Sequence, residues 1–113
     1  MAKLYNLARV TTATLGTGTI TLGAAVAGFL SFAGAGVQNG EVVAYAIKDG
    51  SNSEIGRGTY SSTGPTLSRD RIYQSTNAGA AISLSGTAEV FITPAAEDFR
   101  DLDALRHAQF GGL

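Results

Sequence analysis

The sequence contains 113 residues, carries a formal net charge of −1, and is only 15% charged. A chain of this length is expected to form one domain, and a charge so close to zero gives no electrostatic basis for binding nucleic acid or an anionic membrane. Cysteine is absent from the sequence, which excludes disulfides and thiolate chemistry.

The composition predicts a surface that is poor in charge and rich in small and hydroxyl-bearing residues, because 15 glycines stand beside many threonines and serines. A soluble monomer normally has a more charged surface, whereas a subunit covered by its neighbours needs less charge. We therefore expect the chain to work inside an assembly. The first ten residues, MAKLYNLARV, lack the apolar core of a signal peptide, so synthesis and use in a cytoplasm are expected.

Residues 16–36, GTGTITLGAAVAGFLSFAGAG, have three possible interpretations. The apolar run is too short and too rich in glycine for a membrane helix. A phosphate-binding loop would need a Gly-Lys-Ser/Thr ending, which is missing. A β-strand fits, because threonines alternate with Ile20 and Leu22 at a period of two. The region is therefore predicted to hold strands at residues 10–14 and 17–22, and a further short strand or extended turn at residues 28–32.

The clearest local pattern is in residues 41–61, EVVAYAIKDGSNSEIGRGTYS. Val43, Tyr45 and Ile47 alternate with other residues, and the sequence then turns at Asp49-Gly50, which favours a backbone with positive φ. The sequence returns in a second extended run. This pattern predicts a β-hairpin.

The rest of the body is also extended. TGPTLSRDRIYQST contains two short extended pieces, with Pro65 at an edge or a turn, and strands are predicted at residues 81–85 and 87–93. The predicted fold is all-β, an antiparallel sandwich or small barrel of about seven or eight strands with one short C-terminal helix. The predicted parts are a β domain with a short N-terminal arm, residues 1–94, and a C-terminal helical arm, residues 95–113.

The last segment, TPAAEDFRDLDALRHAQF, changes to a helical period. Thr93 is predicted as the N-cap and Pro94 as the first helical residue, while Phe99, Leu102 and Leu105 recur every three residues. A helix of only about four turns is marginally stable on its own, so it must pack on something. Two partners remain open, the protein's own sheet or a neighbouring subunit.

No motif in the sequence supports catalysis. A nucleophilic hydrolase needs a base beside its nucleophile, and the single histidine, His107, is interpreted as a surface residue. No group of histidines or carboxylates has metal-ligand spacing, and residues 49–54 are better explained as a hairpin turn than as a calcium loop. Residues 68–71, SRDR, are interpreted as a polar loop, with contact to an acidic partner as the alternative. We therefore predict no enzyme activity, no metal and no cofactor.

An ordered series of segments resembles a recurrent module of tailed-bacteriophage structural proteins. The segments are ARVTTATLGTGTITLGAAVAGFLSFAGAGVQNGEVVAYAIKDGSNSEIGRGTY, then TLSRD, STNAGAAISLSGTAEVFIT and AAED. In that family a Thr- and Gly-rich first hairpin precedes a second hairpin of the form YAIxDGxxxEIGxGxY, and the module closes with SGTAEVFIT. The resemblance covers roughly residues 8–98, implies a virion component and carries no catalytic residues. The final stretch, FRDLDALRHAQFGGL, lies outside it.

The resemblance and the composition together lead us to expect a virion structural protein, made in the cytoplasm of a bacterial host. The first expectation is a capsid decoration (cement) protein that binds the major capsid protein and copies of itself, and neither nucleic acid nor membrane. The alternatives are a tail or head-fibre attachment module, whose partner is a tail or fibre protein, and a virion-surface carbohydrate-binding domain. The last is disfavoured by the lack of tryptophan. The residues predicted at the partner interface are Lys3, Leu4, Tyr5, Phe99, Leu102, Leu105 and Phe110.

Overall fold

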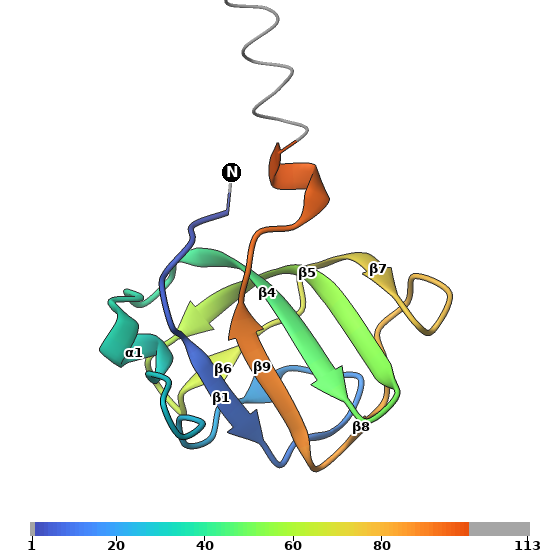
Figure 1. The fold of residues 1–113 in the computed structure, drawn as a ribbon, viewed down its shortest axis with the longest axis horizontal. Coiled ribbons are helices and arrows are strands. Elements are labelled where there is room, and N and C mark those ends of the chain that lie inside the picture. The colour runs from blue at the N-terminus through green and yellow to red at the C-terminus, as the bar shows by residue number, and fades with distance from the viewer. Residues whose placement is uncertain (1, 100–113) are drawn as a thin grey trace, which may run out of the picture.

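The computed structural model describes residues 2–99, which consist mainly of β-strands (Figure 1). The elements are β1 (Arg9–Thr12), β2 (Leu15–Gly16), β3 (Ile20–Thr21), α1 (Phe32–Ala35), β4 (Val42–Asp49), β5 (Asn52–Ser61), β6 (Thr66–Leu67), β7 (Arg71–Ser75), β8 (Leu84–Ser85) and β9 (Ala88–Ile92). The predicted all-β class is confirmed. The described part has nine strands rather than seven or eight, because four of them are two-residue ladders that a period-two pattern cannot resolve.

Seven strands form one antiparallel sheet in the order β1-β9-β4-β5-β6-β3, with β7 also paired to β5. Strands β6 and β7 share the second edge of β5, because β6 pairs with its last two residues and β7 pairs nearer its start. Strands β2 and β8 form a separate pair. The sheet curls into a half-barrel (Figure 1). The core lies on the inner side of this curve.

The predicted hairpin is confirmed as β4 and β5, which pair from Val42 opposite Thr59 to Asp49 opposite Asn52. The turn itself is Gly50-Ser51, one residue later than predicted, with Gly50 at φ 62. Glycine suits this position because the left-handed region carries no Cβ penalty for it. Asp49 belongs to the strand, because its carboxylate accepts hydrogen bonds from the backbone N–H and hydroxyl of Ser85, both at 2.7 Å.

The period of two decides which side chains enter the core. Val43, Tyr45 and Ile47 are at most 1% exposed, whereas Ala46 and Lys48 face the outer side of the sheet. The same alternation holds in the predicted strand 17–22, where Ile20 and Leu22 are buried and the threonines are exposed. The buried cluster also includes residues from β1, β6, β8, β9 and α1: Val10, Leu67, Leu84, Val90 and Phe32.

Two glycines in β5 allow a neighbouring backbone to approach closely. A Cβ added at Gly56 would lie 2.1 Å from the carbonyl oxygen of Arg71, and one at Gly58 would lie 1.8 Å from the carbonyl oxygen of Ser68. Neither distance is physically possible, so only glycine fits. The segment 67–72 is therefore held tightly along the edge of β5.

The segment predicted as a short strand or extended turn at residues 28–32 instead leads into a one-turn helix, α1. Ser31 caps this helix, because its hydroxyl accepts the N–H of Gly34 at 2.9 Å, and Gly36 closes it in the left-handed conformation at φ 110. The side chain of Phe32 anchors it in the core at 2% exposure. Ser31 and Gly36 are ordinary helix-capping residues, but sequence reasoning missed them because they lie in a mainly apolar stretch.

The C-terminal helix begins later than predicted. Thr93 is not its N-cap, because the helical residues start only at residue 96. The Thr93 N–H donates instead to the carbonyl of Ala44 at 3.2 Å, just beyond the end of β9. The described helical residues are 96–99, after Pro94. The carboxylate of Asp98 accepts the N–H of Ala95 at 2.8 Å, which is the backward half of a capping box.

Candidate binding surfaces

The most buried polar contact is an ion pair between Glu54 on β5 and Arg69, in the short segment between β6 and β7. The Arg69 Nη2–Glu54 Oε1 distance is 2.5 Å, and Arg69 Nε donates to Glu54 Oε2 at 2.9 Å. The Tyr45 hydroxyl and the Ile82 N–H complete the carboxylate's partners at 2.6 and 2.9 Å. Arg69 also donates to the carbonyls of Gly16, Gly18 and Ile82. The pair therefore ties the β2–β3 loop and residue 82 to the main sheet.

The buried polar atoms of this cluster all have hydrogen-bond partners, and the cluster is closed to solvent. The side chains of Arg69 and Glu54 are 3% and 0% exposed. Burial and the hydrogen bond to Glu54 raise the pKa of Tyr45. Burial acts to lower the pKa of Arg69, but the hydrogen bond and charge of Glu54 outweigh it and raise that pKa. Tyr45 is therefore neutral and Arg69 is positively charged at neutral pH, as these side chains ordinarily are. The role of the cluster is to stabilise the fold. Arg69 is therefore unavailable to an acidic partner, and the alternative interpretation of residues 68–71 fails at this residue.

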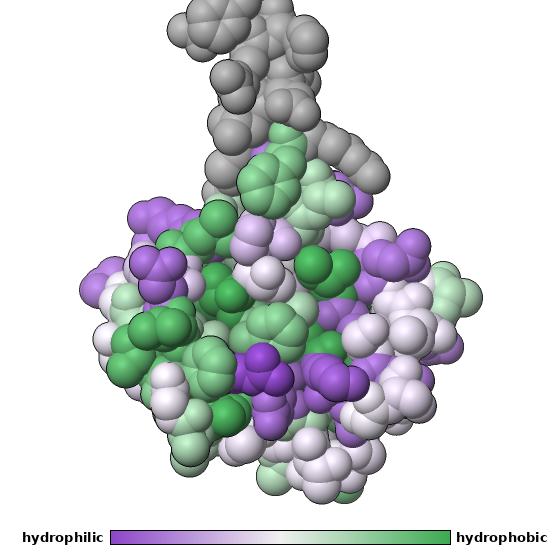
Figure 2. Space-filling model, viewed as in Figure 1, coloured by the Kyte–Doolittle hydropathy of each residue, from purple (hydrophilic) through white to green (hydrophobic). Residues whose placement is uncertain are grey.

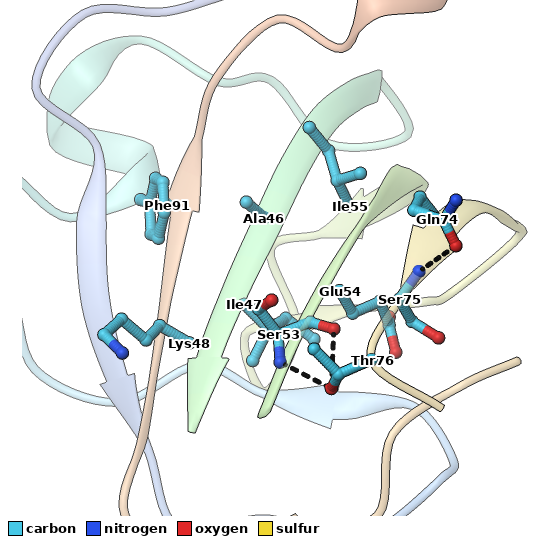
Figure 3. A pocket seen from close by; sticks show the side chains of 10 residues that line it. All are labelled: Ala46, Ile47, Lys48, Ser53, Glu54, Ile55, Gln74, Ser75, Thr76 and Phe91. Atoms are coloured by element: carbon cyan, nitrogen blue, oxygen red, sulfur yellow. Dashed lines mark hydrogen bonds between the residues drawn. The ribbon is translucent and has the colours of Figure 1, made fainter. Parts of the chain in front are cut away.

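The outer face of the sheet carries a hollow of about 340 Å³, which we call the outer groove (Figure 3). Its floor is Ala46, which lies opposite Phe91 on one side and opposite Ile55 on the other. Gln74 continues the row beyond Ile55. The groove exists because the small side chain of Ala46 lies in register between two large ones, Phe91 and Ile55. Figure 2 shows hydrophobic residues gathered over this face, with hydrophilic residues beside them.

One cationic side chain, Lys48, lines the outer groove, and three arginines lie elsewhere on the same face of the sheet. Arg9 stacks over the ring of Phe91 at 4.7 Å and forms an ion pair with Glu89 at 2.6 Å. Arg57 and Arg71 are direct register partners on β5 and β7, two positions along from Ile55 on the same face. Like charges placed opposite each other are unfavourable, and neither arginine has an ion-pair partner among residues 2–99. Arg71 lies instead over the ring of Tyr73, at 5.3 Å from its centroid. The face thus combines an apolar row with two arginines that have no ion-pair partner among residues 2–99.

The predicted N-terminal arm is joined to β4 by an isolated bridge between Lys3 and Val43. The N–H of Lys3 donates to Val42, and the carbonyl of Lys3 accepts from Ala44, at the place on β4 that β9 leaves free. The side chains of Lys3 and Tyr5 both bind Glu41, with Lys3 Nζ–Glu41 Oε2 at 2.6 Å. These contacts lower the pKa of Glu41 to about 2 and raise the pKa of Lys3 through the hydrogen bond to Glu41. Contact of Lys3 and Tyr5 with a partner stays a prediction.

Apolar side chains lie exposed along the N-terminal segment. Leu4 and Leu7 are 48% and 59% exposed, and Leu30 is 42% exposed. Leu7 and Leu30 are neighbours, because the N–H of Leu30 donates to the carbonyl of Leu7 at 2.7 Å. We call these three residues the leucine patch. Leu7 also has φ 64, in the left-handed region that a branched side chain rarely adopts. Contact of Leu4 with a partner stays a prediction. Sequence reasoning did not single out Leu7 and Leu30, since no local pattern reports a positive φ at leucine.

The predicted helical interface is only partly within the described residues. Phe99 is 57% exposed in the helical turn 96–99. Leu102, Leu105 and Phe110 lie outside the described residues, as does His107. Contact of Phe99 with a partner stays a prediction, and the choice between the protein's own sheet and a neighbouring subunit stays open.

Residues 2–99 contain neither a metal-binding cluster nor a membrane-spanning helix. In that range, no three or more His, Cys, Asp or Glu side chains gather in a way that could hold a metal ion. Nor does any helix among the described residues have the length and apolar character to cross a membrane. Every buried side-chain nitrogen and oxygen of the described part has a hydrogen-bond partner. The features that stand out are therefore the two surfaces, the leucine patch and the outer groove.

Comparisons with known proteins identify no relative, since no protein family, curated protein or solved structure matches the chain.

Proposed function

We propose that the chain is a structural protein of a bacteriophage virion, and specifically a capsid decoration protein that binds the assembled head in many copies. The observation that carries this proposal is Leu7, an exposed leucine held in a left-handed backbone conformation. Both features cost free energy in an isolated protein, about 1–2 kcal/mol for the backbone alone. Such strain is typically found where it serves a contact.

The proposed contact with the shell is the leucine patch. Leu7 and Leu30 are held on backbone that is hydrogen-bonded into the body, and Leu4 follows Lys3, which is hydrogen-bonded to β4. These side chains are therefore presented with little conformational freedom to lose on binding. Three leucines give a modest contact. Repetition over a symmetric lattice makes such contacts strong together, because each bound copy raises the effective concentration of the next.

The rigid body suits this role. The buried Glu54–Arg69 pair fastens the β2–β3 loop to the sheet, and Asp49 fastens β8 through Ser85. A decoration subunit must keep one shape to fit every position of a lattice. Low net charge is also favourable, because crowded copies with like charge would repel one another.

The test is quantitative mass spectrometry of purified particles, with the copies of this chain counted per major capsid subunit. Hundreds of copies per particle are expected for a decoration protein. A dozen or fewer would assign the chain to a tail or fibre instead, and none would overturn the proposal.

A pair of variants then tests the leucine patch. Leu7→Asn introduces a residue that tolerates the left-handed region. The free energy of unfolding is therefore expected to stay the same or rise by up to about 1 kcal/mol, while the number of copies bound per particle falls. Leu15→Asn is the matched control, because Leu15 is 71% exposed and lies on β2 outside the patch. Equal copy numbers for both variants would contradict the role of the patch.

A further inference from the structure

We propose that the N-terminal arm, residues 2–5, is exchanged between neighbouring copies of this chain, so that the arm of one copy pairs with β4 of the next. The exchange rests on the proposed function in one respect, that many copies lie side by side in an assembly. The partner is a second copy of the same chain, and the exchanged arm makes the contacts that it already makes within its own chain.

The arm is held on β4 by a small set of contacts that a second copy offers equally. Two backbone hydrogen bonds join Lys3 to Val42 and Ala44, at 2.8 and 3.2 Å. The side chains of Lys3 and Tyr5 both bind the carboxylate of Glu41. All of these partners lie at or next to the start of β4, so the arm of a neighbouring copy meets an identical site. Exchange of the arms therefore loses none of these contacts.

The connection between the arm and the body is the turn formed by Asn6 and Leu7. Backbone bonding into the body begins at the carbonyl of Leu7, which accepts the N–H of Leu30 at 2.7 Å. Between Lys3 and that carbonyl, no backbone hydrogen bond joins the chain to a strand or to α1 among the described residues. The arm can therefore move about this connection without disturbing any strand pair of the sheet.

The connection is also strained when the arm pairs with its own β4. The arm lies beside β4, whereas β1 lies on the far side of β9, because the strand order is β1-β9-β4 (Figure 1). The chain must therefore bend across the end of β9, and it does so with Leu7 in the left-handed region at φ 64. An extended connection to a neighbouring copy removes this bend. Short connections under strain favour exchange of the segments that they join.

Crowding decides when the exchange takes place. In dilute solution the arm's own β4 is the nearest site, since only three residues separate Lys3 from Leu7. Copies that lie side by side bring a second β4 close to each arm, which raises its effective concentration. We therefore expect exchange at high protein concentration, where each exchanged arm links two copies.

Charge exchange between two full-length variants tests the proposal. Lys3→Glu sets a carboxylate against Glu41, and Glu41→Lys sets an amine against Lys3, so neither variant keeps the ion pair within its own chain. When the two variants exchange arms, each new contact pairs a carboxylate with an amine. An equimolar mixture at high concentration is expected to give roughly tenfold more heterodimer than homodimer of either variant, measured by native mass spectrometry.

The chain that carries both Lys3→Glu and Glu41→Lys is the matched control. It restores an ion pair within each copy, so it reports whether the reversed charges are compatible with the fold. It is expected to form no excess of heterodimer with the wild-type chain, because exchange between these two would set like charges together.

The strain at Leu7 gives an independent readout. Leu7→Gly, introduced into both partners of the charge-exchange pair, relieves the strain of the unexchanged chain, because glycine adopts the left-handed region freely. The dissociation constant of the heterodimer is expected to rise by roughly tenfold or more. Asn6→Gly is the control, because it adds a glycine to the same turn at a residue without a positive φ. It is expected to leave the dissociation constant nearly unchanged.

Two results would overturn the proposal. The first is a mixture of the two charge variants that contains no more heterodimer than random mixing gives. The second is a heterodimer whose dissociation constant rises no more with Leu7→Gly than with Asn6→Gly. Both measurements use the free protein in solution, whereas the copy number on purified particles decides the proposed function. Either idea can therefore fail while the other stands.

Discussion

Glu54 and Arg69 face each other inside the protein as a two-point ion pair, with Nη2–Oε1 at 2.5 Å and Nε–Oε2 at 2.9 Å. They are 15 residues apart in the sequence. The carboxylate also accepts the Tyr45 hydroxyl and the Ile82 N–H, so four donors converge on two oxygens. This arrangement fixes where the strand β5 meets the loops that close the core.

Removal of one partner of this pair is expected to be costly. Arg69→Met leaves the Glu54 carboxylate buried and without its cation, which should lower the free energy of unfolding by about 3–5 kcal/mol. Glu54→Gln should act similarly, and the double variant should lose less than the sum. Chemical denaturation measures all three.

Arg71→Gln is the matched control for that series, because Arg71 is exposed. Its effect should stay within about 0.5 kcal/mol. Additive single effects in the double variant would show that the two side chains do not act as a pair.

Gly58 is expected to tolerate no side chain. Gly58→Ala would place a Cβ 1.8 Å from the carbonyl oxygen of Ser68, so β5 and the segment beside it must separate. We expect a loss of about 2 kcal/mol or more in thermal or chemical unfolding. Gly18→Ala is the control, because nothing lies within 4 Å of its Cβ and its φ is not in the left-handed region. A similar loss at both positions would point to glycine loss in general rather than to the close approach.

Glu41 should make the N-terminal segment sensitive to acid. The hydrogen bonds from Lys3 and Tyr5 lower its pKa from 4.5 to about 2. A lowered carboxyl pKa stabilises the folded state above the unfolded pKa, and this contribution disappears as the pH falls through the folded pKa. The stability difference between wild type and Glu41→Gln should therefore be full above pH 4.5 and shrink towards pH 2. A difference independent of pH would contradict the assigned contacts.

Asp98 is expected to hold the start of the C-terminal helix. Asp98→Ala removes the acceptor of the Ala95 N–H, which should cost about 1 kcal/mol locally and speed hydrogen exchange at that amide. Asp98→Glu keeps a carboxylate at the same position and should retain most of the protection. Unchanged exchange at Ala95 in Asp98→Ala would show that the capping contact is unimportant.

Local patterns predicted those parts of the fold that depend on neighbours in the sequence. The alternation of Val43, Tyr45 and Ile47 determined which face of β4 is buried, and Asp49-Gly50 located the hairpin to within one residue. The change of period after Pro94 predicted a helix, although two residues too early. These features follow from backbone geometry, because a strand repeats every two residues and a helix every 3.6.

The candidate surfaces could not be predicted in the same way, because they depend on contacts between distant strands. The pairing of β5 with β7 sets Arg57 opposite Arg71, and the pairing of β4 with β9 sets Phe91 beside Ala46. A shift of one residue in either register would move every one of these side chains to the other face. By itself, the sequence determined that the chain forms a β-sheet and which residues alternate along each strand. Only the tertiary structure, through strand register and the curl of the sheet, decided that Arg69 is buried, that the outer face is hollow and that Leu7 is strained and exposed.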